Sequence, residues 1–337
     1  MGSHRRLAPS GFDRGAAAAL CMLSAAAAAL GAVPAQAAPD ADTRTEVDRL
    51  YVEAEKATQA FDKADERAGE LRQEVRAAQD HIARQQQRVN DLRGQLGSLA
   101  GAQYRAGGID PAVALLFSAD PDEYLDRAAT LDRIGARQAG RLKELQSAMR
   151  QLAQERAEAA GKLAELEKTR KAVAVHKRTV ERKLARARQL INALPTAERA
   201  DYDRASRGSR TELPVPTGAD APDGRAAAAL AAARAALGRP YVWGANGPSG
   251  FDCSGLMQWA YGHAGVHLPR TSQEQRFAGR QVPLSQARPG DLVVYRSDAS
   301  HVAMYAGHGQ VIHAPYPGAP VRYDPVGMMP VSSVTRP

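Results

Sequence analysis

The sequence GFDCSGLMQWAYG, residues 250–262, decides how the C-terminal part of this chain folds. A Gly/Pro-rich loop ends there, Asp252 is a residue type that caps helices, and the residues after it have the apolar spacing of a short helix. Cys253 therefore falls in the first turn of a predicted helix, where free backbone N–H groups and the helix dipole favour a thiolate. Because a thiolate is a strong nucleophile, the stretch predicts a reactive site as well as a fold.

The residues that follow this helix predict a small sheet. Four short runs rich in strand-forming residues are separated by turn residues, and they cover 292–296, 301–305, 310–314 and 321–323. Gly307-His308-Gly309 would turn the second run into the third. Together with an alanine-rich helix at 225–237 and a short helix near 272–277, these runs predict an α+β domain, with helices packed on an antiparallel sheet.

Two histidines are the candidates that would make Cys253 reactive. His301 opens a predicted strand and His313 lies near the end of the next one, so a hairpin can bring the two rings together. His301 would then exchange protons with the thiol and the leaving amine, while His313 would hold its second ring nitrogen. A zinc ion bound by Cys253, His301 and His313 is the alternative. The helix-start position of Cys253 favours a nucleophile, and no metal or cofactor is expected.

Several motifs in order carry a family resemblance. They read GRPYVWGANGPSGFDCSGL, LPRTSQEQ, ARPGDLVVY and SHVAMYAGHGQVIHAP. On these motifs, residues 225–337 resemble the NlpC/P60 family of papain-like cysteine peptidases. The resemblance implies cleavage of peptidoglycan stem peptides, typically between D-γ-glutamate and a diamino acid. It also implies Cys253 as nucleophile, His301 as base and His313 as the third residue.

The resemblance extends to three neighbours of this trio. Tyr241 matches the family's tyrosine beside the active site, where it could join the Cys253 backbone N–H in stabilising an oxyanion. Asp252 and Ser254 flank the cysteine, and in some members these two positions contact the substrate. From the residues alone, Asp252 could equally be a helix cap. The sequence departs from the family pattern at Ala245, where a second glycine is usual.

The middle of the chain predicts a long helical hairpin. Apolar residues step by three and four over 47–99 and again over 128–194, which specifies a coiled coil, and the segment 107–111 breaks the first helix. Asp120 is the predicted N-cap of the second helix. The first arm is acidic and the second basic, so we expect an antiparallel coiled-coil hairpin over 39–194. More loosely, it resembles the N-terminal region of secreted actinobacterial-type cell-wall hydrolases.

The N-terminal segment has the pattern of an export signal. Residues 1–38 combine arginines, an alanine-rich apolar run and a small-residue cleavage motif at Ala37. We expect this segment to be removed and the protein to be secreted and associated with the cell wall. Cys21 lies in the apolar run and would leave with it, so Cys253 would be the single cysteine of the mature chain.

Composition limits the classes of partner. The 337 residues carry 45 Lys+Arg and 37 Asp+Glu, a net charge of +8, but the basic residues divide between the signal, the second arm and the C-terminal domain. Export and the lack of interleaved aromatic residues argue against nucleic acid. Residues 195–224 are rich in proline, glycine and charge and predict a flexible linker.

Three functions therefore stay open. The first is a secreted peptidoglycan endopeptidase that acts through an acyl-thioenzyme, with the hairpin as a regulatory arm or as a docking arm for a membrane or division-complex protein. The second is an acyltransferase or amidase of the same fold. The third is a non-enzymatic scaffold that binds the cell wall or a division complex.

Overall fold

The computed structural model describes residues 39–105, 113, 121–197, 199–200 and 224–337. The predicted signal (1–38), the predicted helix break, the Asp120 cap and most of the predicted linker lie outside the described residues. Asp40–Pro337 form a single compact unit. Within the described part of the chain, no helix combines the length and the apolar character that crossing a membrane would require.

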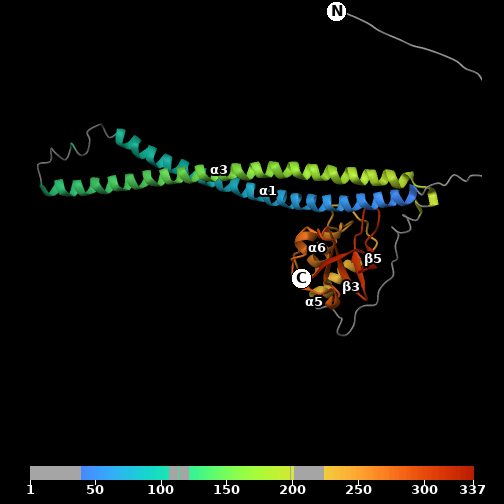
Figure 1. The fold of residues 1–337 in the computed structure, drawn as a ribbon. Helices are drawn as coiled ribbons and strands as arrows, with labels where there is room; N and C mark the ends of the chain where they lie inside the picture. Colours follow the sequence, from blue (N-terminus) through green and yellow to red (C-terminus); the bar gives the residue numbers. More distant parts are fainter. Residues whose placement is uncertain (1–38, 106–112, 114–120, 198, 201–223) are drawn as a thin grey trace, which may run out of the picture. The chain divides into compact units, whose positions relative to one another are not determined.

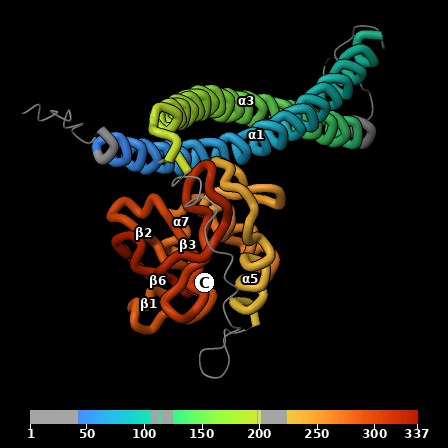
Figure 2. Tube along the Cα trace, turned by 90° about the vertical axis from the view of Figure 1, so that its right-hand side faces the viewer, coloured from blue at the N-terminus to red at the C-terminus, as the bar shows by residue number. Residues whose placement is uncertain are grey.

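Two long helices make up the N-terminal half of the described chain. Helix α1 spans Pro39–Arg105 and helix α3 spans Pro121–Ala193, and they run side by side for much of their length (Figures 1 and 2). Their lengths correspond to about 100–110 Å of helix. The expected helical hairpin is therefore present.

Contacts between the two helices show that they are antiparallel. Early residues of α1 meet late residues of α3, as in the ion pair of Glu53 with Lys183, whereas Arg88 meets Glu144 at 2.8 Å. Apolar clusters at heptad spacing lie between these ion pairs, and one of them contains Ala68, Leu71, Val75 and Leu166. The opposite charge of the two arms thus supports the pairing that the apolar seam specifies.

The C-terminal domain, residues 224–337, is an antiparallel sheet covered by helices. Its helices are α5 (Gly224–Ala235), α6 (Cys253–His263), α7 (Ser272–Gln275) and the 3-10 helix η2 (Leu284–Gln286). Its strands are β1 (Arg280–Val282), β2 (Leu292–Tyr295), β3 (His301–Gly307), β4 (Gln310–His313), β5 (Arg322–Pro325) and β6 (Val331–Arg336). Their order in the sheet is β1-β6-β2-β3-β4-β5, with every pairing antiparallel. The α+β prediction is confirmed.

Two of the six strands, β1 and β6, were not predicted from the sequence. Strand β1 has only three residues, of which Val282 alone is buried, and β6 is rich in serine and threonine. Neither has the apolar alternation by which strands are detected. The run predicted at 321–323 begins one residue later, because the Val321 backbone bonds to the carbonyl of Arg239 at 2.7 Å outside the sheet.

The core forms on both faces of the sheet. Alternate residues of β2 divide between the faces: Leu292 and Val294 join the helices α5 and α6, whereas Val293 and Tyr295 face the opposite cluster. Helix α6 packs on β3 from the first face. Cys253, at the start of α6, is therefore held against the sheet where β3 begins with His301.

Candidate active site

The start of α6 is fixed by its cap and by a glycine. Asp252 has an extended backbone and accepts a hydrogen bond from the Gly255 N–H at 2.7 Å, so it is the N-cap. A Cβ on Gly255 would lie 2.2 Å from the carbonyl oxygen of Ala245. The loop that contains Ala245 thus packs directly on the first turn of α6. Cys253 is the first residue of this helix, with 0% of its surface exposed.

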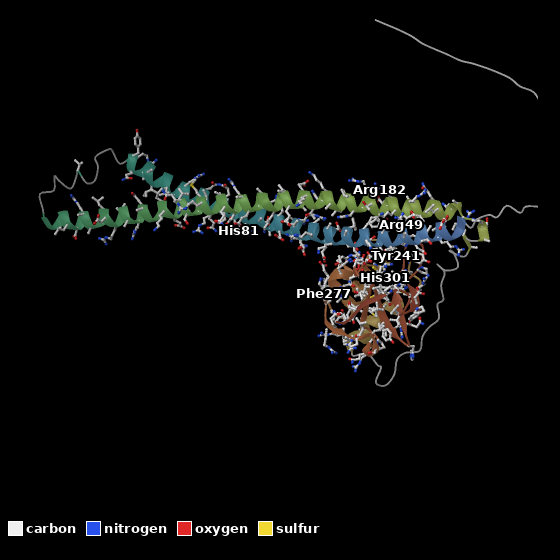
Figure 3. All side chains as sticks on the ribbon, viewed as in Figure 1. Arg49, His81, Arg182, Tyr241, Phe277 and His301 are labelled. Carbon is white, nitrogen blue, oxygen red and sulfur yellow. The ribbon has the colours of Figure 1, made fainter. Side chains whose placement is uncertain are left out.

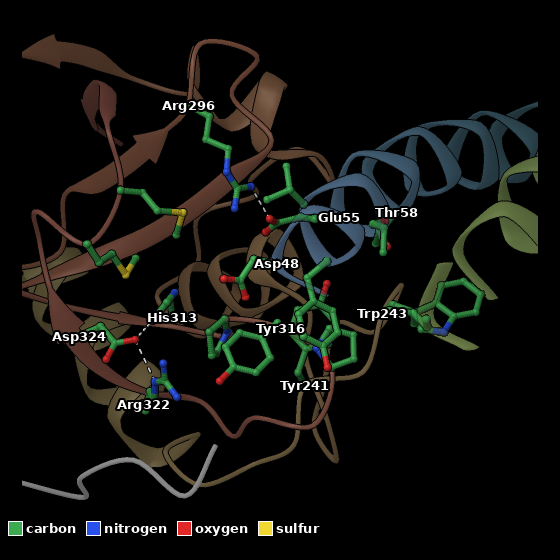
Figure 4. A pocket seen from close by; sticks show the side chains of 18 residues that line it. Asp48, Glu55, Thr58, Tyr241, Trp243, Arg296, His313, Tyr316, Arg322 and Asp324 are labelled. Atoms are coloured by element: carbon green, nitrogen blue, oxygen red, sulfur yellow. Dashed lines mark hydrogen bonds and ion pairs between the residues drawn. The ribbon is translucent and has the colours of Figure 1, made fainter. Parts of the chain in front are cut away.

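A chain of hydrogen bonds runs through the histidines. His301 Nε2 lies 2.8 Å from His313 Nδ1, and His313 Nε2 lies 2.8 Å from Asp324 Oδ2. Strands β3, β4 and β5 are adjacent, so each supplies one member of the chain. Asp324 also accepts a hydrogen bond from Arg322 Nε at 2.8 Å (Figure 4). The predicted pairing of His301 with His313 is present, and Asp324 extends it.

The direction of these hydrogen bonds follows from the carboxylate. Burial lowers the pKa of His313 to about 4, although its hydrogen bond with Asp324 opposes that shift, so the ring is neutral at pH 7. A carboxylate only accepts, so the single proton of His313 is on Nε2 and its Nδ1 is an acceptor. His301 Nε2 therefore donates to His313, and this fixes the orientation of the His301 ring.

Helix α1 places a glutamate on the other nitrogen of His301. Glu55 contacts His301 Nδ1 and also forms an ion pair with Arg296 (Figure 4). Burial opposes the ionisation of Glu55, but His301 and Arg296 hold its pKa below the ordinary value. Because an ionised Glu55 only accepts, His301 Nδ1 must also carry a proton. His301 is therefore hydrogen-bonded at both nitrogens, and Glu55 occupies Nδ1.

The thiol of Cys253 is held in its protonated form in this arrangement. Burial, Glu55 and Asp252 raise its pKa well above the ordinary value, against a backbone hydrogen bond with Val302. Ligand atoms of Cys253, His301 and Glu55 all lie within 4.8 Å of one another. The candidate nucleophile and the candidate base are thus adjacent, but Glu55 occupies the nitrogen that would accept the thiol proton.

One helical turn further along α1, Gln59 covers Cys253. Its Nε2 lies 3.6 Å from the thiol and 3.2 Å from Ser254 Oγ, and its Oε1 accepts from the Ser272 N–H at 2.7 Å. The Ser272 N–H can only donate, which fixes the orientation of the amide. Gln59 is 3% exposed, so nothing else reaches the thiol from that side.

Asp62 completes the contact of α1 with the site. It lies 3.0 Å from Arg270, which also pairs with Asp252 and donates to Ser254 Oγ at 3.0 Å. Burial and the nearby Asp252 raise the pKa of Asp62 to about 9. Asp62 therefore holds a proton at neutral pH, while Arg270 and Asp252 form the ion pair.

All six residues predicted for the site lie in one region, whose position Figure 3 marks with Tyr241 and His301. Tyr241 is buried, and burial and the neighbouring Cys253 raise the pKa of its hydroxyl. Asp252 is both the cap of α6 and a partner of Arg270. The zinc alternative does not fit, because His313 directs both nitrogens away from Cys253, toward His301 and Asp324.

A cavity of about 330 Å³ continues from this site. The C-terminal domain lines it with Tyr241, Arg296, His313 and Tyr316 among others, and α1 closes one side with residues that include Glu55 (Figure 4). The hairpin thus forms a wall of the cavity that leads to His313.

Besides Asp324, two groups of residues were missed in the sequence. Arg270 and Ser272 lie within the motif LPRTSQEQ, so the signal was present but no role was assigned to it. The α1 residues Glu55, Gln59 and Asp62 occur at i, i+4 and i+7 on one helix face. Polar side chains in such positions usually face solvent, and no pattern within the helix distinguishes these three.

Comparisons with known proteins agree on the C-terminal domain. Residues 238–334 match the model of the NlpC/P60 family. A probable endopeptidase of Corynebacterium glutamicum is 45% identical over 124 residues, which cover 35% of this chain and 59% of that protein. The peptidoglycan endopeptidase RipA of Mycolicibacterium smegmatis is 46% identical over 111 residues, or 28% of this chain and 22% of RipA.

A crystal structure of the NlpC/p60 domain of the peptidoglycan hydrolase SagA is 38% identical and aligns with 33% of this chain and 98% of that structure, with a TM-score of 0.32. The chain spans less than two thirds of the length of each of the two curated relatives.

Proposed function

The chain contains an NlpC/P60 domain at residues 238–334, and on that premise we propose that the protein is a secreted, wall-associated peptidoglycan endopeptidase that α1 keeps latent. The bond that it cleaves would be the amide between D-γ-glutamate and the diamino acid of the stem peptide. The names of the two curated relatives, a probable endopeptidase and the peptidoglycan endopeptidase RipA, support this substrate. The observation that carries the proposal is Cys253 at a helix start, beside the chain His301–His313–Asp324.

Catalysis begins once Glu55 leaves His301. Once the Nδ1 proton that Glu55 held has passed to solvent, His301 takes the proton of the Cys253 thiol, and the thiolate attacks the carbonyl carbon of the γ-glutamyl amide. A C–S bond forms, and the Cys253 backbone N–H stabilises the oxyanion, with Tyr241 beside it. His301 then returns its proton to the departing amine as the C–N bond breaks. Water attacks the carbonyl carbon of the acyl-thioenzyme and gives a proton to His301. The C–S bond then breaks to release the carboxylate product, and His301 returns the proton to the Cys253 thiolate.

His313 and Asp324 hold the His301 ring in one orientation during this cycle. Because Asp324 holds the proton of His313 on Nε2, His313 Nδ1 accepts from His301 throughout the reaction. The His301 ring therefore keeps Nδ1 directed toward the thiol and cannot flip. His313 and Asp324 are positioning residues, since neither contacts the reacting atoms.

The latent state follows from the contacts of α1. Glu55 occupies the base, Gln59 covers the nucleophile, and both are almost fully buried. Activation requires the hairpin to move, and a membrane or division-complex protein that binds the hairpin would be a suitable trigger. This role gives the hairpin both functions that its length allows, namely docking and regulation.

A mass-resolved digest of muropeptides tests the proposal. We expect the full chain to release products with a new amine on the diamino acid, slowly, and Cys253→Ala to release none. Products without a new amine would favour an acyltransferase or amidase. A Cys253→Ala protein that cuts as fast as the parent would refute the thiol mechanism, and binding of cell wall without cleavage by any variant would favour a scaffold.

A further inference from the structure

Arg296 loses its carboxylate partner when the enzyme opens. In the latent state it is paired with Glu55 of α1 and donates to Ser300 Oγ at 3.1 Å. The two other arginines near the site keep partners within the C-terminal domain, because Arg270 pairs with Asp252 and Arg322 with Asp324. Withdrawal of α1 thus leaves a carboxylate site beside His301, with Arg296 as its cation.

The backbone of Arg296 supports a functional role. Its φ is +65°, a left-handed conformation that is costly for a residue with a side chain. Strained residues of this kind are concentrated at ligand-binding sites, where the rest of the structure holds them in place. The backbone N–H of Arg296 donates to the carbonyl of Pro330 at 2.8 Å, which helps to hold the turn. The guanidinium lines the cavity described above, with 21% of the side chain exposed.

The side of the scissile bond that Arg296 faces follows from the chemistry of His301. His301 protonates the leaving amine, so the groups around its Nδ1 lie on the leaving-group side of the bond. Both His301 Nδ1 and Arg296 Nη1 contact the same carboxylate of Glu55. A carboxylate on the leaving group could replace that of Glu55 and reach the same guanidinium.

Gln59 adds a second point of comparison with a substrate. Its side chain is itself a γ-glutamyl amide, and its amide nitrogen faces Cys253. Glu55 lies one turn earlier on the same face of α1, so the helix presents an amide at the thiol and a carboxylate beyond it. This pattern corresponds to a γ-glutamyl amide whose amine component carries a free carboxylate.

We propose that Arg296 is a specificity-determining residue that binds the free side-chain carboxylate of the diamino acid, and that Glu55 stands in for this carboxylate in the latent enzyme. The inference rests on the proposed endopeptidase function. It predicts that stems with meso-diaminopimelate are preferred over stems with lysine, which lacks that carboxylate, or with amidated diaminopimelate.

Full-length Glu55→Ala/Gln59→Ala protein tests this inference, because its site is relieved of the α1 side chains that contact His301 and Cys253. Cleavage of three stem peptides is compared, with meso-diaminopimelate, its side-chain amide or L-lysine as the third residue. The kcat/KM for the diaminopimelate stem should exceed the other two by about ten- to a hundredfold, as expected for a charge-assisted hydrogen bond.

Variants of Arg296 in the Glu55→Ala/Gln59→Ala protein show whether Arg296 causes the preference for the diaminopimelate stem. Arg296→Ala should abolish the preference by slowing only the diaminopimelate stem, Arg296→Lys should retain part of it, and the exposed Arg280→Ala on β1 should leave it unchanged. Equal cleavage of all three stems, or a preference that survives Arg296→Ala, overturns this inference but leaves the endopeptidase intact. Failure to cut any stem overturns both. If Arg296→Ala does not fold, by circular dichroism, the Arg296→Lys ratio decides.

Discussion

Glu55 accepts a hydrogen bond from Nδ1 of His301, a residue 246 positions later in the chain. The contact joins the N-terminal hairpin to the base of the proposed active site. It occupies Nδ1 of His301, whose other nitrogen is already bonded to His313, and it adds a negative charge beside the thiol of Cys253. One side chain of α1 thus acts on the base and on the nucleophile together.

Removing this contact should activate the enzyme. We expect Glu55→Ala to raise the rate of muropeptide cleavage by the full chain by about tenfold or more, because a single buried, ion-paired contact is worth a few kcal/mol. The measurement is the rate of amine release. Glu70→Gln, an exposed carboxylate on the same helix, is the matched control and should leave the rate unchanged. An unaltered rate in Glu55→Ala would contradict latency through this residue.

The reactivity of Cys253 gives an assay that needs no substrate. Burial, Glu55 and Asp252 raise the pKa of its thiol, so the latent protein should react with iodoacetamide only slowly at pH 7 and faster as the pH rises. Glu55→Ala should lower that pKa and speed alkylation at pH 7. Cys253→Ala serves as the blank, which removes any contribution of Cys21. Equal alkylation rates in the two proteins would argue against the charge effect of Glu55.

Asp62 should make latency sensitive to alkaline pH. Its pKa is raised from an ordinary acidic value to about 9, so the docked state holds a proton that a free aspartate would have lost. The docked state is therefore favoured at low pH and weakens as pH rises toward 9. We expect the full chain to become more active from pH 7 to 9 relative to Asp62→Asn, which cannot ionise. Parallel pH profiles for the two proteins would mean that ionisation of Asp62 does not control latency.

Asp324 should affect turnover rather than binding. Without its carboxylate, the proton of His313 can move to Nδ1, and His301 loses its acceptor. In a Glu55→Ala background, Asp324→Ala should lower kcat about tenfold or more and leave KM nearly unchanged. Because Arg322 also loses a partner, the melting temperature is measured alongside. A rise in KM with an unchanged kcat would mean that Asp324 contacts the substrate instead.

Two glycines of α6 provide a paired stability test. Gly255→Ala places a methyl group 2.2 Å from the Ala245 carbonyl oxygen and should destabilise the domain by several kcal/mol or prevent its folding. Gly262→Ala meets nothing within 4 Å and should stabilise the helix by about 0.5–1 kcal/mol. Urea unfolding monitored by tryptophan fluorescence compares them. Similar midpoints would mean that the loop at Ala245 can move away.

The local part of the site could be predicted from sequence, and the long-range part could not. Cys253 at a helix start follows from the cap residue and the apolar spacing after it, and the pairing of His301 with His313 follows from a short hairpin. Asp324 could not be placed, because it lies just after the run predicted at 321–323 and its position depends on how β5 pairs with β4. Even Phe61, expected in the seam of the hairpin, has its ring against Trp243 of the C-terminal domain.

The position of β6 in the sheet sets an order of events during synthesis. Because β6 separates β1 from β2, the sheet remains incomplete until residues 331–336 have emerged from the ribosome. The residues of α1, Pro39–Arg105, emerge long before those of β6. The proposed inhibitory helix is therefore made before the proposed active site is complete, so the site would be closed from the moment it forms.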